Sequence, residues 1–302
     1  MFRYILAATG LKMFSFTPST KRLYRAIGNI LGARKRSRGT MPEYYLDRVN
    51  QMLELNRRYG VPQVGYKLLE LGTGWVHWEA ITCRLFFDIH CTLYDVWDNR
   101  QMSGLKNYIS QLDTMLIRVN ADKAQLERAH RLIAKILEVK DFDELYRVLG
   151  FEYVVDQSGR LRQFENASFD IIVSGGVLEH IPASFASEYV YDIARMLKSG
   201  GHSFHSINIR DHLCQYDRAV SPKQYMRYSD RAWKRWFEND VQYINKIQRS
   251  DWLTLFEKVG LKLIEEQIDT EDTSNLRMDR DYQRYNESDV RCCELKLLHY
   301  KP

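Results

Sequence analysis

The sequence predicts a doubly wound α/β fold, in which helices cover both faces of a mainly parallel sheet. Three stretches support this prediction. Residues 66–89 contain an apolar strand, a glycine turn and a helix-like segment, residues 91–96 form a short apolar strand, and residues 169–174 read as a buried strand. Strands that alternate with helical segments are typical of sheets built from βαβ units. We expect the first stretch to organise the chain.

The first stretch has the form of a nucleotide-binding βα unit. Its strand at residues 66–71 is mostly apolar and includes Glu70, and Gly72, Thr73 and Gly74 follow as a turn. Glycines let the backbone bend sharply and let a ligand approach main-chain N–H groups. The start of the next helix adds a partial positive charge. The Glu70 carboxylate suits a cationic ligand better than a pyrophosphate. An ordinary strand-to-helix turn is the alternative interpretation.

The next elements supply further acids. The strand at 91–96 contains Asp95, about 20 residues past the glycine turn, where a carboxylate can accept hydrogen bonds from both ribose hydroxyls of a nucleoside. Asp98 takes this role if the strand runs longer, and a solvent-exposed acid at a strand end is the structural alternative. A third strand is predicted at 151–155, directly before Asp156.

The fourth strand leads into a polar segment. After residues 169–174, Gly175 and Gly176 leave room for a ligand, and the sequence Leu-Glu-His-Ile at 178–181 follows. A helix is then expected over 185–198. The turn Leu-Lys-Ser-Gly-Gly at 197–201 leads into a fifth strand.

These motifs resemble three motifs of class I S-adenosylmethionine-dependent methyltransferases of the type 11 kind, in the family's order. Glu-x-Gly-x-Gly at 70–74 resembles the first motif, with Val76 where the family often has a third glycine. The segment 169–181 resembles the fourth-strand motif, and 197–201 resembles the turn before strand five. The resemblance implies a Rossmann-like seven-stranded sheet of order 3-2-1-4-5-7-6 with the last strand antiparallel, and S-adenosylmethionine as cofactor.

The resemblance also implies a cofactor-binding shell. In this shell the methionine moiety is faced by Glu70, Gly72, Thr73 and Gly74. Asp95 faces the ribose, and Asp156 faces the adenine. The main chain at Ser174, Gly175 and Gly176 lies on the sulfonium side.

Candidates for the acceptor side follow strands four and five, where a parallel sheet places its ligand crevice. They are His180, Asn208, Asp211 and His212. The Asp211-His212 step can supply a general base near neutral pH or half of a metal site. Adjacent residues need not face each other, so no dyad is implied. For His180 a structural hydrogen bond is the favoured alternative.

Composition limits the class of protein. The 302 residues have the apolar and charged fractions of a globular protein, and no apolar run approaches the ~20 residues of a membrane span. Five scattered cysteines without a Cys-x-x-Cys pair argue against a disulfide framework or a zinc site, and for a reducing cytoplasm. We therefore expect a cytoplasmic protein, and the cysteines suggest no metal ligands.

The net charge of +5 is unevenly placed. Nine of the 44 Lys and Arg lie in residues 1–40, which lack Asp and Glu, so the remainder has 35 bases against 39 acids. A basic arm at residues 1–38 can attract an anionic membrane surface, at about 1 kcal/mol per charge, or it can pack on the body as a helix. Because the body is mildly acidic and no Asn/Asp-Pro-Pro-Tyr-like motif follows Ser174, a nucleic-acid substrate is not expected.

The remaining elements complete the predicted organisation. Residues 1–60 form an N-terminal helical extension, and residues 61–302 form the main domain, with a helical insertion near 102–150 and an acceptor-side cap near 211–249. Helices are expected at 21–31 (capped by Ser19 or Thr20), 43–59, 114–118, 123–137 (capped by Asn120), 142–149 and 251–259 (capped by Ser250), a linker at 32–40, a hairpin at 157–164, and strands at 203–209, 261–268 and 294–300.

The region 215–249 is rich in Tyr, Trp and Arg. Aromatic and amide side chains suit the stacking and hydrogen bonding of a sugar ring, and a packed helical cap is the alternative. Residues 205–260 weakly resemble methyltransferases of bacterial surface-polysaccharide assembly. We therefore predict O-methylation of a sugar or glycan hydroxyl, with the glycan carried by a lipid and the basic arm at the membrane. A small aromatic or lipid acceptor, or a binding protein without turnover, are the alternatives.

Overall fold

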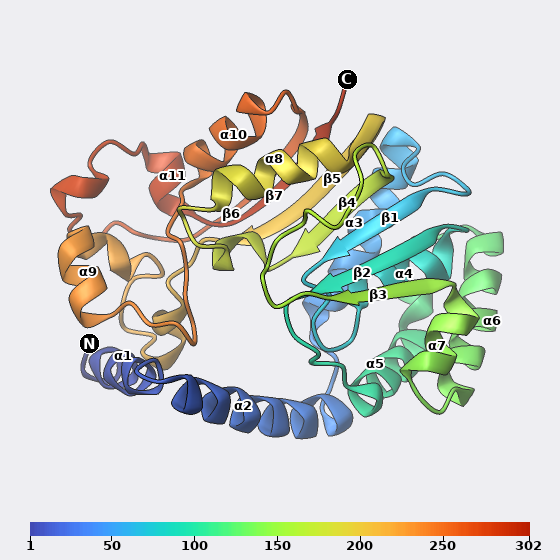
Figure 1. Cartoon of the computed structure of the whole chain (residues 1–302), viewed down its shortest axis with the longest axis horizontal. Coiled ribbons are helices and arrows are strands. Elements are labelled where there is room, and N and C mark those ends of the chain that lie inside the picture. The colour runs from blue at the N-terminus through green and yellow to red at the C-terminus, as the bar shows by residue number, and fades with distance from the viewer. The chain divides into compact units, whose positions relative to one another are not determined.

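The computed structural model describes residues 1–302 and contains one seven-stranded sheet (Figure 1). Its strands are β1 Lys67–Leu71, β2 His90–Asp95, β3 Phe151–Val155, β4 Phe169–Gly175, β5 Leu197–Asn208, β6 Lys262–Thr270 and β7 Cys292–Tyr300. They are ordered β3-β2-β1-β4-β5-β7-β6, so the predicted fold class is confirmed. Ile209 N donates to Cys293 O and Gly200 N donates to Lys301 O, which shows that β7 runs antiparallel to β5.

The chain divides into two compact units. The first unit comprises Met1–Gly28, Gly176–Tyr191 and His205–His299. The second unit comprises Asn29–Gly175, Asp192–Phe204 and Tyr300–Pro302. The helix α8, Ala186–Met196, and the strand β5 contribute residues to both units.

The core of the second unit is the parallel part of the sheet. β1 pairs in parallel with both β2 and β4, with Leu68 opposite Cys91 on one side and Ile171 on the other. Leu68, Leu69 and Leu71 are fully buried. A strand covered on both faces is apolar along its whole length, and for this reason a continuous apolar run predicted β1 correctly.

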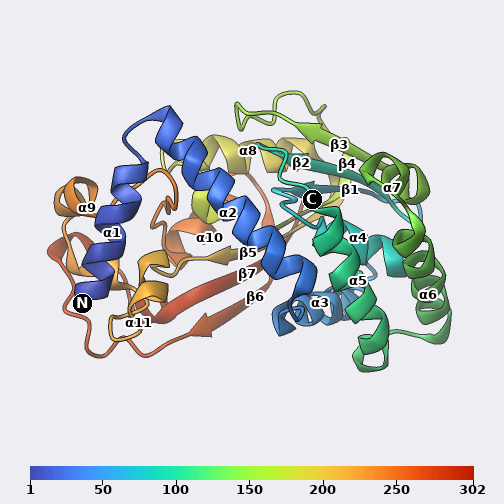
Figure 2. The same ribbon diagram turned by 90° about the horizontal axis from the view of Figure 1, so that it is seen from below.

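The helices of the second unit pack beside these strands (Figure 2). They are α3 Glu43–Tyr59, α4 Trp78–Phe86, α5 Met102–Met115, α6 Lys123–Glu138 and α7 Phe142–Leu149, with the short helix η1 at Leu116–Arg118. The predicted helices at 43–59, 123–137 and 142–149 are confirmed. The predicted helix at 114–118 comprises the last two residues of the longer α5 and the short helix η1. Residues of α5, α6 and α7 belong to one buried cluster with β1 and α4, so the insertion is part of the core.

Three local predictions in the second unit are wrong. Asp122 rather than Asn120 caps α6, because its side chain accepts from Gln125 N in a capping box. Residues 157–164 form turns and no hairpin strand. The predicted linker at 32–40 is largely helical, since α2 runs over Pro18–Arg38.

The long α2 has clear physical causes. At its start, Thr17 Oγ1 accepts from Thr20 N while Thr17 N donates to Thr20 Oγ1, which replaces the predicted Ser19 or Thr20 cap. At its end, the Arg36 guanidinium lies 4.0 Å from the centre of the Trp75 ring, and Arg36 Nε donates to Gln101. These tertiary contacts outweigh the helix-breaking tendency of the glycines.

The first unit begins with the helix α1, Phe2–Phe14, which lies in the predicted helical extension although no helix was predicted at these residues. Its buried side chains, Tyr4, Ala8 and Leu11, pack in an aromatic cluster with Tyr225 and Trp233. The other elements of this unit are η2 Leu178–His180, η3 His212–Tyr216, η4 Gln224–Arg227, α9 Asp230–Trp236, α10 Arg249–Lys258, η5 Arg280–Tyr282 and α11 Glu287–Arg291. Helix α10 begins with a capping box of Gln248 and Asp251 instead of the predicted Ser250 cap. No helix of the chain has the length and apolarity that crossing a membrane requires.

Candidate active site

The glycine turn of the second unit follows β1 directly. Gly72 and Gly74 have φ values of 64° and 61°, in the left-handed region that favours glycine. A Cβ built on Gly74 would meet only Gly72 O, at 3.8 Å, so the main chain here is open to a ligand. Between them, Thr73 is buried, and its N–H donates to Tyr94 O. The turn is therefore tied to the end of β2.

Asp95 lies at the end of β2, as predicted. Its carboxylate accepts from Gly74 N at 2.8 Å and from Trp97 N at 3.2 Å. Burial raises the pKa of this carboxyl, and the main-chain donors act in the opposite direction. Asp98, the alternative, is bound to Arg100 through two hydrogen bonds of 2.8 Å. Asp95 is thus the acid that lies against the glycine turn.

Glu70 lies inside the protein. It is 1% exposed and accepts from Ala80 N in the first turn of α4. Burial and the neighbouring Glu79 carboxyl raise its pKa well above the usual value, because two carboxylates in one site cannot both stay ionised without cost. The Arg48 guanidinium of α3 lies on the other side of Glu79, with Nη1 2.6 Å from its Oε1.

Arg48 and Glu79 lie beside the predicted cofactor residue Gly175 and were not predicted from the sequence. A Cβ on Gly175 would lie 2.6 Å from Glu79 Oε1 and 2.9 Å from Arg48 Nη1, so both charged groups occupy the space beside this glycine. Ser174 is buried and pairs in register with Leu71. The only signals in the sequence were one arginine on the predicted helix at 43–59 and one acid after the glycine turn.

The position of Val76 also has a structural explanation. Val76 is buried in the core cluster, and the next residue, His77, is fully buried with φ 49°. His77 Nδ1 lies 2.7 Å from Thr73 Oγ1, and its Nε2 lies 2.9 Å from Tyr146 OH. Burial lowers the pKa of His77 to about 3. A neutral histidine bonded to Thr73 supports the turn where a third glycine would otherwise stand.

Asp156 follows β3, as predicted, and its N–H donates to Asp95 O. Its exposed carboxylate accepts from the N–H and the hydroxyl of Ser158, and these bonds lower its pKa. The ends of β1, β2, β3 and β4 thus bring the predicted cofactor residues of the second unit to one edge of the parallel strands.

In the first unit, the segment after β4 holds Glu179 and His180. Glu179 is 2% exposed. Asn245 holds this segment in place, since its Nδ2 donates to Leu178 O and Ile181 O, and its N–H donates to Glu179 O. His180 Nδ1 lies 2.7 Å from Tyr243 O. The predicted structural hydrogen bond of His180 is therefore present.

Asp211 and His212 follow β5, and their side chains have different partners. Asp211 is fully buried and accepts from Tyr4 OH at 2.7 Å and Leu213 N at 2.9 Å. Burial raises its pKa to about 6. Asp211 caps η3, which begins at His212, and its bond to Tyr4 joins this loop to α1. Its geometry is that of a positioning residue.

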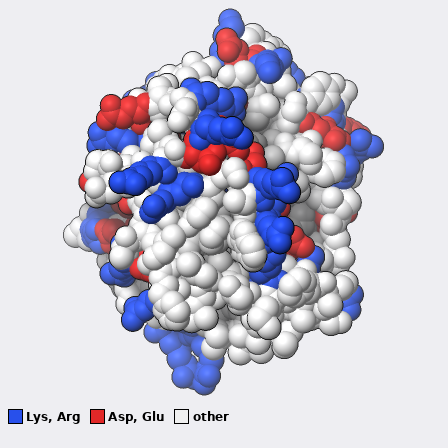
Figure 3. All heavy atoms as spheres, turned by 90° about the vertical axis from the view of Figure 1, so that its left-hand side faces the viewer, with Lys and Arg blue, Asp and Glu red and all other residues white.

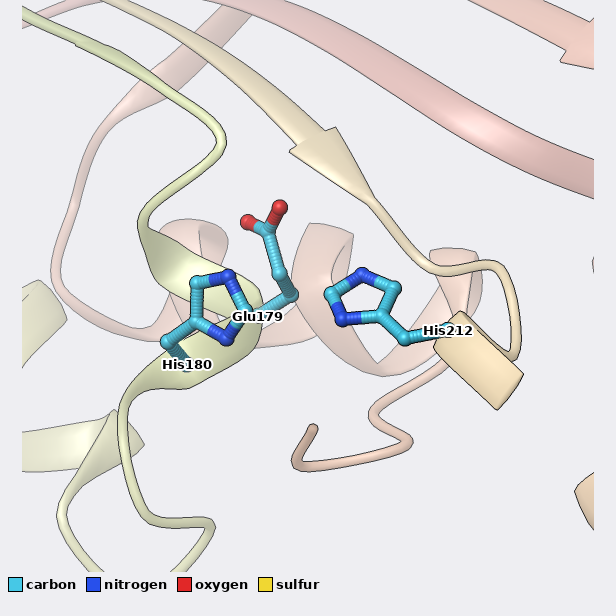
Figure 4. Close-up of side chains that lie close together, drawn as sticks. All are labelled: Glu179, His180 and His212. Atoms are coloured by element: carbon cyan, nitrogen blue, oxygen red, sulfur yellow. The ribbon is translucent and has the colours of Figure 1, made fainter. Parts of the chain in front are cut away.

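The His212 ring lies against the His180 ring, with 5.2 Å between the ring centres. Burial, then His180 and Arg210, lower the pKa of His212 to about 4, well below the neutral value expected for a general base. Figure 4 shows both rings beside the Glu179 carboxylate. One ligand atom from each of these three residues lies within 4.8 Å of those of the other two. Glu179 was not among the candidates predicted from the sequence, which were His180, Asn208, Asp211 and His212.

The aromatic residues of 215–249 lie mostly inside the first unit. Tyr225 and Trp233 are buried and pack in the same cluster as Tyr4, whereas Trp236 and Tyr216 are exposed. The packed helical cap, given above as the alternative to a sugar-binding surface, therefore describes most of this region.

A family model described as a methyltransferase domain matches residues 37–266. The chain belongs to this family. The predictions of a class I methyltransferase and of S-adenosylmethionine as its cofactor are thereby confirmed. No curated protein matches the chain.

Several solved structures are similar to this chain. One is a complex of the Haloferax volcanii Trm112 methyltransferase activator with a protein assigned as a methyltransferase, at 15% identity over 85% of this chain and 90% of that chain, with a TM-score of 0.44. Another is a Galdieria sulphuraria protein assigned as a sarcosine dimethylglycine methyltransferase, at 12% identity over 85% and 86%, with a TM-score of 0.48. A third is Haemonchus contortus phosphoethanolamine N-methyltransferase 2, at 16% identity over 84% and 52%, with a TM-score of 0.43.

Proposed function

We propose that the glycine turn and the strand ends of the second unit bind S-adenosylmethionine. The proposed shell comprises Glu70, Gly72, Thr73, Gly74, Asp95, Asp156, Ser174 and Gly175, to which we add Arg48 and Glu79. The residues fit this cofactor: the main chain at Gly74 is open, and Asp95 lies where ribose hydroxyls can replace its main-chain donors. Glu79 and Arg48 supply opposite charges that match the ammonium and carboxylate of a methionine moiety.

We further propose that the acceptor is a hydroxyl of a sugar or glycan. When bound, the cofactor supplies an electrophilic methyl group. Methyl transfer to the hydroxyl oxygen would leave the electron pair of the broken S–C bond on sulfur, and the hydroxyl proton would pass to Glu179, His180 or His212. The observation that supports an oxygen acceptor is the group formed by Glu179, His180 and His212, in which neutral imidazoles and a carboxylate offer lone pairs to a hydroxyl.

A surface groove in the first unit favours an acceptor with an apolar part. It has a volume of about 400 Å³ and is lined by Arg3, Leu6, Ala7, Gly10, Leu11, Phe14 and Tyr216. Apolar side chains with one base suit a lipid chain next to an anionic group. A lipid-linked glycan has both parts that these features suit: a lipid chain for the groove, and hydroxyls for the group of Glu179, His180 and His212.

The helix α1 supports the proposed membrane contact. Phe2, Leu6 and Met13 are 79%, 62% and 62% exposed. The face on the left of Figure 1 has a largely uncharged lower part with Lys and Arg at its margins (Figure 3). Exposed apolar side chains with nearby bases are typical of helices that lie on anionic lipid surfaces.

The membrane contact has a direct test in sedimentation with vesicles that contain anionic lipid. We expect Phe2→Ser with Leu6→Ser to reduce binding by about thirtyfold or more, because each side chain loses on the order of 1–2 kcal/mol of apolar burial. Ile117→Ser is the control, since Ile117 is 93% exposed in the other unit. Equal losses in both proteins would count against α1 as the contact.

The acceptor class has its own test, which uses the full-length protein with S-adenosylmethionine. Transfer is followed by mass spectrometry on a lipid-linked glycan, the same glycan released from lipid, and a small aromatic alcohol. We expect a mass increase of one methylene on the lipid-linked glycan, with slower transfer to the free glycan. Transfer to the aromatic alcohol alone would show that the acceptor is a small aromatic alcohol and not a sugar. Cofactor binding without transfer to any of the three would favour the binding-protein alternative.

A further inference from the structure

The geometry points to a binding site for one divalent first-row transition-metal ion, such as Zn²⁺ or Mn²⁺, formed by Glu179, His180 and His212 of the first unit. The three side chains offer two imidazole nitrogens and one carboxylate oxygen (Figure 4). Such a donor set suits zinc, iron and related ions, whereas magnesium and calcium prefer oxygen ligands alone.

The hydrogen bonds around His180 favour coordination. Its Nδ1 lies 2.7 Å from Tyr243 O, which can only accept a hydrogen bond, so Nδ1 carries the proton. The lone pair of the neutral ring is then on Nε2. Metal-binding histidines commonly donate their second N–H to a main-chain carbonyl, which fixes the tautomer and the ring orientation.

The two imidazole rings lie close enough to share one ion. Their centres are 5.2 Å apart. One ligand atom of each ring lies within 4.8 Å of the other and of a Glu179 carboxylate oxygen.

The third ligand and its surroundings are also held in place. Asn245 binds the main chain on both sides of Glu179, and Asp211 fixes the start of η3 next to His212. Gly176 leaves open space near the carboxylate, since a Cβ there would meet Glu179 Oε1 at 3.5 Å. Ligand atoms around one ion lie about 3–4 Å apart when bonds are ~2.1 Å. The spread of up to 4.8 Å therefore requires a small inward movement of these side chains.

Three protein ligands leave a coordination position open. An acceptor hydroxyl in that position would lose its proton more readily, because the ion stabilises the alkoxide. This role rests on the proposed oxygen acceptor, whereas ion binding itself does not. The two are therefore tested by separate measurements.

The binding test uses the full-length, untagged protein after dialysis against a chelator. Zn²⁺ and Mn²⁺ are titrated by calorimetry and by competition with a chromophoric chelator. We expect one ion per chain, and at least a tenfold loss of affinity in His212→Gln and in Glu179→Gln. His130→Gln is the matched control, because His130 lies at the surface beside a carboxylate, with its Nδ1 2.9 Å from Asp113 Oδ1.

Thermal unfolding with Zn²⁺ and binding of S-adenosylhomocysteine test the same variants. Zn²⁺ should raise the melting temperature of the unaltered protein and of His130→Gln but not of His212→Gln, and binding of S-adenosylhomocysteine shows whether each variant is folded. If His212→Gln fails to fold, His180→Gln takes its place. Absence of stoichiometric binding, or an affinity in the Glu179 and His212 variants equal to that of the unaltered protein, would overturn the site. Full turnover by metal-free protein would overturn the role of the ion in the reaction.

Discussion

The two units hold their buried polar groups in different ways. In the second unit, Asp95 and Glu70 are bound by main-chain N–H groups at the start of one strand–turn–helix segment. In the first unit, Glu179 and His212 come from segments more than 30 residues apart and meet side chain to side chain. Main-chain donors recur wherever a chain makes the same turn, whereas a side-chain cluster depends on packing. A local motif can therefore reveal the first kind of site but not the second.

This comparison leads to four predictions, of which the largest effect is expected at Asp95. Asp95→Ala removes a carboxylate that we place against the ribose hydroxyls, and each hydrogen bond to a charged group contributes about 1.5–3 kcal/mol. We expect calorimetry to show at least a hundredfold loss of affinity for S-adenosylhomocysteine. Asp98→Ala is the control, since Asp98 pairs with Arg100. An equal loss in both variants would show that the strand end is disturbed and that the ribose contact is not specific. Zn²⁺ affinity should stay unchanged in both.

A smaller effect is expected at Arg48. Arg48→Met keeps most of the apolar stem but removes the charge beside Glu79, so we expect about a tenfold loss of cofactor affinity. Arg57→Met is the matched control, because Arg57 lies on the same helix and pairs with the exposed Glu54. Affinity for adenosine, which has no methionine moiety, should be equal in the two variants. Unchanged cofactor affinity in Arg48→Met would place the methionine moiety elsewhere.

The third prediction concerns the pH dependence of stability. His205 is fully buried, and burial with the neighbouring His299 lowers its pKa from 6.5 to about 3. Between pH 6.5 and 3 the unfolded chain binds the proton and the folded chain does not, so the free energy of unfolding falls as the pH falls. The contribution is at most about 1.4 kcal/mol per pH unit. Urea titrations at several pH values should show that the free energy of unfolding depends less steeply on pH in His205→Gln than in the unaltered protein. The exposed His90→Gln should keep the pH dependence of the unaltered protein.

The fourth prediction concerns the stability contributed by Tyr4. Tyr4→Phe removes the hydroxyl that donates to buried Asp211 at 2.7 Å. A lost hydrogen bond to a buried carboxylate costs about 1–3 kcal/mol, which thermal unfolding can detect. The exposed Tyr191→Phe serves as control. If the loop of His212 depends on this bond, Zn²⁺ affinity falls as well while cofactor affinity does not. A fall in cofactor affinity without a fall in Zn²⁺ affinity would contradict the proposal that the second unit binds the cofactor and the first unit binds the metal ion.

The differences between the predictions and the structure have common physical causes. The segment 32–40 contains glycines and serine that suggest a linker, but Arg36 contacts Trp75 and Gln101 and the helix continues. The aromatics of 215–249 suggest a ring-binding surface, but Tyr225 and Trp233 pack against α1, which the sequence analysis did not predict. In both places the decisive partner is far away in the sequence.

The sequence by itself determined the fold class, the strand order through its resemblance, and the positions of the glycine turn and Asp95. These features depend on local patterns: buried strands are apolar throughout, and a left-handed turn favours glycine. Only the tertiary structure decided that Glu70 is buried beside Glu79, that Arg48 lies next to Gly175, and that Glu179 joins His180 and His212. Such groupings depend on how distant segments pack, and residue spacing along the chain carries no information about that.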